Sequence, residues 1–419
     1  MSSDDPLNRA TPIAAPHRVL FVEASVGGVL GGSLTGILHL IERMDRRRFA
    51  PSLVLYEPKD VIASLRADGV PVHVLPPLPA PQADGERNRL ARGWLRAREL
   101  VSVVLPRARA LARLFRAERP DLVYLANAVT TNLDGVLAGA LCGIPLIVHE
   151  KGLRRIGPIE RLLSRRVDTL IGMTEAVTAH ARAKGIRARR FLTIYDGINC
   201  EAFAPGGGAA VRAEFGIPPD APLVGIVGHL QRWKGQLLVV EAVARARRQH
   251  PDLRCLIVGG VHRLGEDYAA EVRERIAAEG LEGHVILTGA RRDVAACMDA
   301  MDVVIHSSIR PEPFGRVLIE AMALGRPVIA PRLGGPREIV ADGETGVLVA
   351  PRDVAALAEA IAGLVADEPR RLAMGRAARA RVDRVFDIRH HVQAVEQVFD
   401  DILGAETVVP PATRAAAAV

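Results

Sequence analysis

The chain has 419 residues, 49% of them hydrophobic and 25% charged, so it is long enough for two or three domains with ample cores. Aromatic residues make up only 4%, which argues against recognition of single-stranded nucleic acid by base stacking. No apolar run is long enough to predict a membrane span, and the polar, proline-rich residues 1–17 predict a disordered terminus without a signal peptide. The four cysteines suit a reducing compartment and form no Cys-x-x-Cys metal motif (Cys142, Cys200, Cys255 and Cys297).

Strand and helix patterns alternate through the first half of the chain. Residues 18–23 form a buried apolar run that predicts a strand, which leads into the glycine loop 27–32 and a helix over 33–44. The same reasoning predicts six further strands, over 53–56, 72–75, 122–125, 146–149, 169–173 and 191–195. It also predicts two more helices, over 131–142 and 174–184.

Residues 86–119 form a strongly basic segment. It holds ten arginines and three acids, a net charge of +7, which equals the excess of the whole chain. Interleaved apolar residues such as Trp94 and Phe115 predict a basic amphipathic helical pair, which could lie on an anionic membrane surface. An outer, solvated helix pair explains the pattern equally well. Nucleic acid is a third partner class, but no recognised nucleic-acid motif occurs, so we expect none.

The alternation restarts after residues 205–210, Pro-Gly-Gly-Gly-Ala-Ala, which predict a flexible break. Gly334, Gly335 and Glu338, followed by 342–346, read as a loop, a short helix and a hairpin-like turn, and 405–419 as a loose tail. The other predicted elements are strands 223–228, 253–258, 285–288, 302–306 and 327–330, and helices 235–249, 268–279, 292–300, 315–324, 353–366, 369–385 and 388–403. This order predicts an α/β protein with two doubly wound parallel sheets, and ligands at the carboxyl ends of their strands, in the cleft between the two halves.

Two glutamates eight positions apart, Glu312 and Glu320, are the most informative pair. Prolines flank Glu312 and disfavour a helix there, whereas residues 315–324 are good helix formers, so a helix should begin between the two carboxylates. A helix N-terminus attracts anions. Carboxylate, phosphate site and carboxylate in this order match a nucleotide sugar, with its sugar hydroxyls, diphosphate and ribose diol respectively. The alternative is a core helix with Glu320 on its solvent face.

Arg232 and Lys234 follow the first strand of the second half and open a helix, which predicts a phosphate-binding position. The order of a Walker A loop is absent, and both cations could instead be solvated. The first glycine loop lacks the G-x-G-x-x-G pattern, which weakens a nicotinamide-dinucleotide hypothesis but still permits close approach to a ligand. His149 ends a predicted strand, where a structural role is an alternative to a place in the cleft. No Asp-x-Asp triplet occurs, so we expect no metal.

With these residues assembled, the chain resembles glycosyltransferase family 4, the retaining, nucleotide-sugar-dependent transferases of GT-B fold, over about residues 18–403 and most densely over 225–351. The resemblance implies two Rossmann-like domains, an acceptor domain over 18–204 and a donor domain over 205–386. It also implies a crossover helix over 387–404 that packs back on the first domain.

The resemblance also implies roles for individual residues. Glu312 would lie beside the donor sugar and Glu320 on the ribose, while Arg232 and Lys234 would stabilise the leaving diphosphate. His149 matches a histidine near the transferred sugar. The remaining implied donor-binding residues are Gly31 and Gly32 beside the phosphates, Phe314, Gly315 and Arg316 at the helix start, and Arg291 in the loop that borders the base.

Three positions depart from the family pattern. His229 replaces a frequent arginine after the phosphate-loop glycine, Pro313 replaces a glycine after the first glutamate, and Asp196 replaces the usual asparagine before Gly197. The first departure places more of the diphosphate binding on Arg232 and Lys234.

The predicted function is a transfer, without metal or other cofactor, from a nucleoside-diphosphate sugar (UDP and GDP being the main candidates) to a glycan or lipid-linked acceptor. Polysaccharide, lipopolysaccharide or glycolipid assembly, in the cytoplasm or at the cytoplasmic membrane face, is the expected setting. A nucleotide-sugar epimerase and a catalytically silent nucleotide-sugar binding protein are the alternatives. A glycoside hydrolase would need two carboxylates about 5–9.5 Å apart across one bond, which this motif does not suggest.

Overall fold

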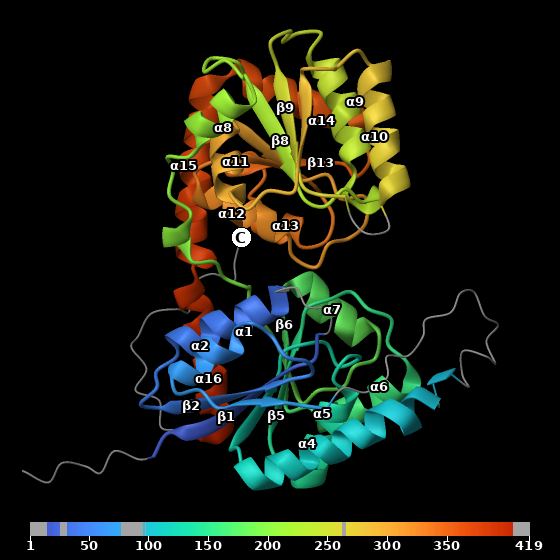
Figure 1. Ribbon diagram of the computed structural model, residues 1–419, viewed down its shortest axis with the longest axis vertical. Helices are drawn as coiled ribbons and strands as arrows, with labels where there is room; N and C mark the ends of the chain where they lie inside the picture. Colours follow the sequence, from blue (N-terminus) through green and yellow to red (C-terminus); the bar gives the residue numbers. More distant parts are fainter. Residues whose placement is uncertain (1–14, 26–31, 77–94, 97, 262–264, 405–419) are drawn as a thin grey trace, which may run out of the picture.

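The computed structural model describes residues 15–25, 32–76, 95–96, 98–261 and 265–404. Two α/β halves stand one above the other in Figure 1, each built on a parallel sheet covered by helices. The expected α/β architecture of two Rossmann-like units is therefore confirmed. No helix within these described ranges is long and apolar enough to cross a membrane.

The first sheet has seven parallel strands in the order β3-β2-β1-β4-β5-β6-β7. Its central strands β1, β4 and β5 are mostly apolar and largely buried, as expected for a parallel sheet covered on both faces. Its strands are β1 (His17–Glu23), β2 (Phe49–Leu55), β3 (Val72–Val74), β4 (Leu122–Leu125), β5 (Leu146–Glu150), β6 (Thr169–Gly172) and β7 (Arg190–Thr193). Its helices are α1 (Gly32–Arg43), α2 (Ile62–Ala67), α4 (Leu105–Glu118), α5 (Leu133–Cys142), α6 (Pro158–Leu163) and α7 (Glu175–Ala183).

The second sheet has six parallel strands in the order β10-β9-β8-β11-β12-β13. Its strands are β8 (Leu223–Val227), β9 (Arg254–Val258), β10 (Val285–Gly289), β11 (Val303–Ile305), β12 (Val328–Pro331) and β13 (Gly346–Val349). Its helices are α8 (Gly208–Glu214), α9 (Gln236–Ala246), α10 (Glu266–Ala278), α11 (Val294–Ala300), α12 (Arg316–Ala323), α13 (Pro336–Ile339), α14 (Val354–Ala366) and α15 (Glu368–Val385), and α16 (Ile388–Leu403) follows.

The predicted flexible break at 205–210 is wrong at its end, because α8 begins at Gly208. The Asp299 carboxylate accepts hydrogen bonds from the amides of Gly206 and Gly208, both at 2.9 Å. A Cβ on Gly208 would lie 2.7 Å from the Asp299 carbonyl oxygen, so the glycine allows a close contact rather than a loose linker.

The hairpin-like turn expected over 342–346 instead leads into β13, which pairs in parallel with β12.

The basic segment also differs from the expected helical pair. Where it is described, the π-helical turn η1 (Leu100–Val104) continues directly into α4, so residues 100–118 form one helix. Residues 77–94 and 97 lie outside the described residues.

The C-terminal helix α16 returns to the first half of the molecule, as expected (Figure 1). The edge of the Phe399 ring meets the Phe49 ring at 5.4 Å between centroids, and Phe399 also contacts Phe21 and Tyr124. Where the chain crosses between the halves, the Ile198 amide donates to the Phe386 carbonyl and the Ile388 amide donates to the Ile198 carbonyl, each at 2.9 Å. These two crossing segments therefore support one another.

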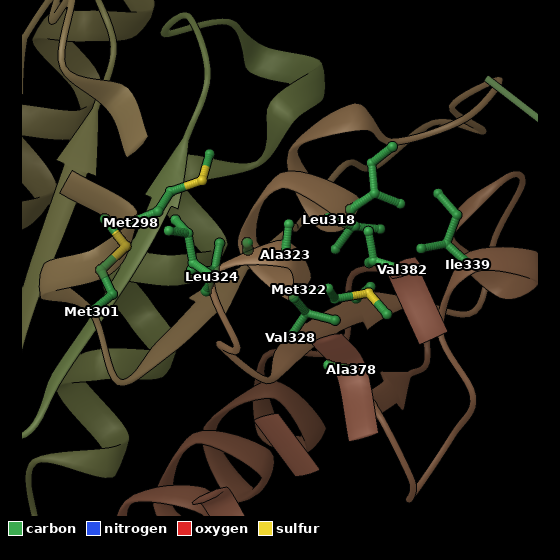
Figure 2. Close-up of a cluster of buried hydrophobic side chains, with 14 of the residues drawn as sticks. Met298, Met301, Leu318, Met322, Ala323, Leu324, Val328, Ile339, Ala378 and Val382 are labelled. Atoms are coloured by element: carbon green, nitrogen blue, oxygen red, sulfur yellow. The ribbon is translucent and has the colours of Figure 1, made fainter. Parts of the chain in front are cut away.

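The core beneath α12 fixes the helix that carries the second glutamate. Figure 2 shows Leu318 and Met322 of α12 in one buried cluster with Ile339 of α13 and Val382 of α15. All four side chains are fully buried. Because α12 presents this apolar side to α13 and α15, its N-terminus and its polar side are left to face the other half.

Candidate functional site

A cavity of about 430 Å³ lies between the two sheets, where residues after the carboxyl ends of first-sheet strands meet the turn before α12. The first half contributes polar side chains, and the second contributes the turn itself. The lining includes Ser25, Ser33, Asn127, Lys151, Arg154 and Asp196 from the first half, and Glu312, Pro313, Phe314, Gly315, Arg316 and Ile319 from the second. Another cavity, of about 470 Å³, lies at the start of α16 and is lined by none of the predicted site residues.

Glu312 is bound by three donors. The Lys234 ammonium and the Ser308 hydroxyl each donate at 2.8 Å, and His306 forms a short contact with the second carboxylate oxygen. Burial acts to raise the pKa of Glu312, but His306 and Lys234 outweigh it and hold that pKa far below the ordinary value. These donors therefore favour the ionised form of the Glu312 carboxyl group.

The helix after Glu312 starts where predicted. Gly315 precedes α12 with a φ of 115°, a conformation that glycine adopts without strain, and the first turn of α12 faces the cavity. Arg316 donates from Nε to Glu320 at 2.8 Å, one turn along the helix. Burial raises the pKa of Glu320, and Arg316 offsets part of that effect. Glu320 itself does not line this cavity, whereas Arg316, its hydrogen-bond partner, does.

The structure does not bring the two predicted cations together. Lys234 points to Glu312, whereas Arg232 points outward and donates from Nη1 to Glu271 of α10 at 2.8 Å. Arg232 also lies over the Tyr268 ring, 5.2 Å from its centroid. Both residues occupy the turn before α9, as predicted, but Arg232 would have to leave Glu271 to reach a ligand at Glu312.

His149 is buried beneath the cavity. Its Nδ1 lies 2.5 Å from the Tyr124 hydroxyl, its Nε2 lies 3.6 Å from Asp196, and its ring stacks on that of His391 at 5.8 Å. Burial and the charge of Lys151 lower the pKa of His149 well below its usual value, despite the opposing effect of Asp196. The lowered pKa favours the neutral imidazole, and His149 does not itself line the cavity but faces Asp196, which does.

Asp196 and Lys151 form an ion pair in the cavity to which the sequence assigned no role. The Lys151 ammonium lies 3.4 Å from both Asp196 oxygens. Burial would raise the pKa of Asp196, but Lys151 and then His149 lower it to about 2. Two features of the sequence could have pointed to this pair: the departure from asparagine at 196, and the fact that Lys151 is one of four lysines in the whole chain. His391 had no local signal, because α16 reaches the site from nearly 200 residues farther along the chain.

The remaining predicted residues lie at different places. Phe314 is buried against Phe386, with ring centroids 6.0 Å apart. Arg291 is bound to Glu214 and Asp293 and does not line the cavity. Gly32 is the first residue of α1, and Gly31 lies outside the described residues.

One group of three side chains could in principle bind a metal. Within the described part of the chain, ligand atoms of His149, Asp196 and His391 lie within 4.8 Å of one another. Lys151 already pairs with Asp196, and its positive charge opposes a cation there. The expectation of a metal-free protein stays a prediction.

The chain is similar to known glycosyltransferases along most of its length. Residues 31–197 match the glycosyl transferase 4-like domain, and residues 209–381 match the glycosyl transferases of group 1. A D-inositol 3-phosphate glycosyltransferase of Corynebacterium urealyticum is 34% identical over 234 residues, 54% of each chain. The chain spans about half the length of the first curated relatives that it matches. The lipopolysaccharide core biosynthesis mannosyltransferase LpsB of Rhizobium meliloti is 26% identical over 81% of this chain and 95% of that protein.

Two solved structures share the two-domain architecture. HepE of Anabaena in complex with UDP-glucose is 25% identical, with a TM-score of 0.72 over 92% of this chain and 99% of that one. Sucrose-phosphate synthase of Thermosynechococcus elongatus, 23% identical, has a TM-score of 0.72 over 93% of this chain and 100% of that one, which shows the fold alone. Since the two matched domains together extend from residue 31 to residue 381 on this fold, the chain belongs to the family 4-like glycosyltransferases of GT-B fold.

Proposed function

We propose that this protein is a retaining glycosyltransferase that moves a sugar from a nucleoside-diphosphate sugar to a glycan or lipid-linked acceptor. The observation that carries the proposal is the cavity between the sheets, which combines the ionised Glu312 with the N-terminus of α12. The complex of HepE with UDP-glucose, on a fold of the same architecture, supports a nucleotide-sugar donor. LpsB supports a setting in lipopolysaccharide or related surface glycan synthesis.

The hard step in such a transfer is departure of the nucleoside diphosphate from the anomeric carbon. Lys234, Arg316 and the free amides of α12 would stabilise the negative charge that develops on the leaving phosphate. Glu312 would bind the sugar hydroxyls. Glu320, whose carboxylate also accepts a hydrogen bond from Arg316, would bind the ribose diol. Closure of the two halves would exclude water and orient the acceptor hydroxyl for attack on the face from which the diphosphate departs.

The side of the cavity that the first half forms includes two cations, Lys151 and Arg154. Lys151 lines it as an ion pair with Asp196, whereas Arg154 is exposed and its guanidinium forms no hydrogen bond or ion pair with any other described residue. An unpaired guanidinium suits a phosphate or carboxylate. We therefore infer that the acceptor carries an anionic group, as a phosphate-linked lipid or an acidic sugar does.

The outer face of α4 supports a location at the membrane surface. Val103 and Val104 of the preceding turn η1 and Phe115 of α4 are buried, so the main apolar side of this continuous helix faces the protein. The outer side combines exposed Val101 and Leu105 with a run of exposed arginines, Arg109, Arg113 and Arg116. We propose that this face binds anionic lipid and brings the cavity to a lipid-linked acceptor.

The donor can be identified by thermal shift with UDP, GDP, ADP and CMP and their common sugars, each with and without EDTA. We expect one diphosphate series to raise the melting temperature, and EDTA to leave the shift unchanged. Lys234→Ala should weaken binding of that diphosphate by about tenfold or more, since a hydrogen bond between charged groups is lost. The exposed Lys184→Ala is the control.

The outcomes distinguish the alternatives. No shift with any nucleotide, or unchanged turnover in Lys234→Ala, would contradict the proposed donor site. Conversion of the donor to an epimer without an acceptor would identify an epimerase. Selective nucleotide-sugar binding with no product of either kind would identify a silent binding protein.

A further inference from the structure

The turn that carries Glu312 is held from both halves of the molecule. Within its own half, the Gly335 amide donates to the Glu312 carbonyl at 2.8 Å. A Cβ on Gly334 would lie 2.5 Å from that same carbonyl oxygen, and a Cβ on Gly335 would lie 2.4 Å from the Phe314 carbonyl oxygen. The two glycines therefore let the start of α13 pack directly on the backbone of this turn.

The first half supplies the other support. Thr174, fully buried at the start of α7, donates from its hydroxyl to the Pro313 carbonyl at 2.8 Å. The same hydroxyl oxygen caps α7 by accepting from the Val177 amide at 3.2 Å. One residue away from Glu312, the turn is thus bonded to a helix of the opposite half.

Glu338 makes the reverse connection, from the second half to the first. Its two carboxylate oxygens accept from the amides of Glu175 and Ala176, at 2.7 and 2.8 Å, and the Tyr195 hydroxyl lies 3.3 Å away. These amides belong to the first turn of α7, whose N–H groups have no partner within the helix. A carboxylate there also interacts favourably with the helix dipole.

The base of Glu338 is fixed to its own half. Arg381 of α15 donates from Nη2 to the Glu338 carbonyl at 2.8 Å and from Nε to the Ile339 carbonyl at 2.7 Å. In Figure 1, α13 lies at the lower edge of the second half and α7 at the upper edge of the first, facing each other. Movement of the two halves apart would therefore break the contacts of Glu338 and Thr174 rather than bend α13.

We infer that Thr174 and Glu338 are positioning residues that complete the Glu312 turn only when the two halves are closed. In the closed form, α7 is hydrogen-bonded to Glu338 of α13 and to the Pro313 carbonyl. The start of α13 packs on the backbone of Glu312, and Pro313 is the next residue in the chain. Opening removes the support from the first half, which leaves the carboxylate and the start of α12 less well placed for the donor sugar. This inference rests on the proposed transferase function, and it explains how α7 of the first half can control the position of the donor turn.

The first test measures shape and does not need a substrate. In small-angle X-ray scattering of the full chain, Glu338→Ala combined with Thr174→Val should have a larger radius of gyration than the wild type. Glu359→Ala, an exposed glutamate on α14, and Thr174→Ser, which keeps the hydroxyl, should match the wild type. An unchanged radius in the double variant would overturn the role of these contacts in closure, whether or not a donor is ever found.

The second test separates positioning from general stability. With the donor identified as above, Glu338→Ala and Thr174→Val should each lower kcat for transfer or donor hydrolysis by roughly tenfold to hundredfold, the effect of small misplacements. The dissociation constant of the nucleoside diphosphate alone should change less than about threefold, because α12 still binds the phosphates. Equal loss of kcat and of diphosphate affinity would indicate a merely structural role and would overturn the inference, as would unchanged kcat. Recovery in Thr174→Ser would support it.

Discussion

Glu312 shows how strongly the surroundings of a single residue decide its state. Its carboxylate is partly buried, which alone would favour the protonated form, yet Lys234 and His306 favour the ionised form. Neither partner is adjacent in sequence to Glu312: Lys234 precedes α9 and His306 follows β11. The spacing of the two glutamates located the turn, but the ionisation depends on contacts between separate strand ends.

Glu150 lies beside this site and should give folding a measurable dependence on pH. Burial raises its pKa from 4.5 to about 7, against the Arg154 charge and hydrogen bonds from the amides of Val129 and Gly152. The folded protein retains a proton that the unfolded chain releases at lower pH, so stability falls as pH rises from 4.5 through about 7. Relative to Glu150→Gln, the wild-type free energy of unfolding should fall by up to about 3 kcal/mol over this range.

Urea unfolding at a series of pH values measures this difference. The exposed Glu359→Gln serves as the control and should follow the wild-type curve. Parallel curves for wild type and Glu150→Gln would show that Glu150 titrates normally.

Arg154 should decide the affinity for an anionic acceptor group. With the nucleoside diphosphate saturating, methyl phosphate should raise the melting temperature of the wild type. Arg154→Ala should weaken methyl phosphate binding by about tenfold or more, because a charge-assisted hydrogen bond is lost, and should leave diphosphate affinity unchanged. Arg155→Ala is a matched control, since Arg155 is exposed and does not line the cavity. Loss of diphosphate affinity in Arg154→Ala would instead assign this arginine to the donor.

Among the elements, α12 and α4 were recognised from different kinds of pattern. The start of α12 followed from prolines and glycine that limit the backbone, and the observed helix differs from the expected one by a single residue at each end. For the basic segment, composition predicts helical structure in the form of a pair of helices. Its described part over 100–118 is instead one continuous helix. Charge alone also does not predict which side of this helix is buried. Its apolar side packs against α5 and the first sheet.

The outer face of α4 leads to an expectation for membrane binding. The triple variant Arg109→Glu, Arg113→Glu and Arg116→Glu should lose at least about tenfold in binding to anionic vesicles, since each basic residue contributes roughly 1 kcal/mol near such a surface. Vesicle flotation measures the bound fraction, with zwitterionic vesicles as a reference. Charge reversal at three exposed arginines of the second half, Arg273, Arg370 and Arg376, is the control. Equal binding by both triple variants would contradict a specific membrane face.

At the scale of the whole molecule, the last helix holds the first half together. Phe399 of α16 is fully buried among Phe21, Phe49 and Tyr124, which lie more than 270 residues earlier in the chain. The same helix supplies His391 to the stack on His149. Truncation or mutation at the C-terminus therefore acts on the first half and on the floor of the cavity.

Phe399→Ala should lower the free energy of unfolding by about 3–5 kcal/mol, the usual cost of removing a buried phenyl ring. Leu372→Ala is the control, because Leu372 of α15 is 51% exposed and should cost little. Denaturant unfolding monitored by circular dichroism gives both values. A cost for Phe399→Ala no greater than that of Leu372→Ala would mean that α16 adds little to the first half.

The alternation of local patterns was enough to predict most strands and long helices, since apolar runs and helix formers act over a few residues. Several short elements were missed. The helices α2, α6 and α8 and the strand β13 were not predicted, and the last two begin at glycines that permit close backbone contacts. These contacts, such as that of Gly208 with Asp299, come from residues far away in sequence and leave no local periodicity.

The sequence by itself determined the α/β class, the two-sheet organisation, the helix start beside Glu312 and the resemblance to family 4, because each depends on local backbone preference or a contiguous motif. Only the tertiary structure decided which charges meet. It separated Arg232 from Lys234 and placed Asp196 with Lys151 above His149. It also joined Thr174 to Pro313, and Glu338 to the first turn of α7, across the two halves. The physical reason is that ion pairs and hydrogen bonds act over a few ångströms in space, and the crossovers of a parallel sheet bring together strand ends that are distant in the chain.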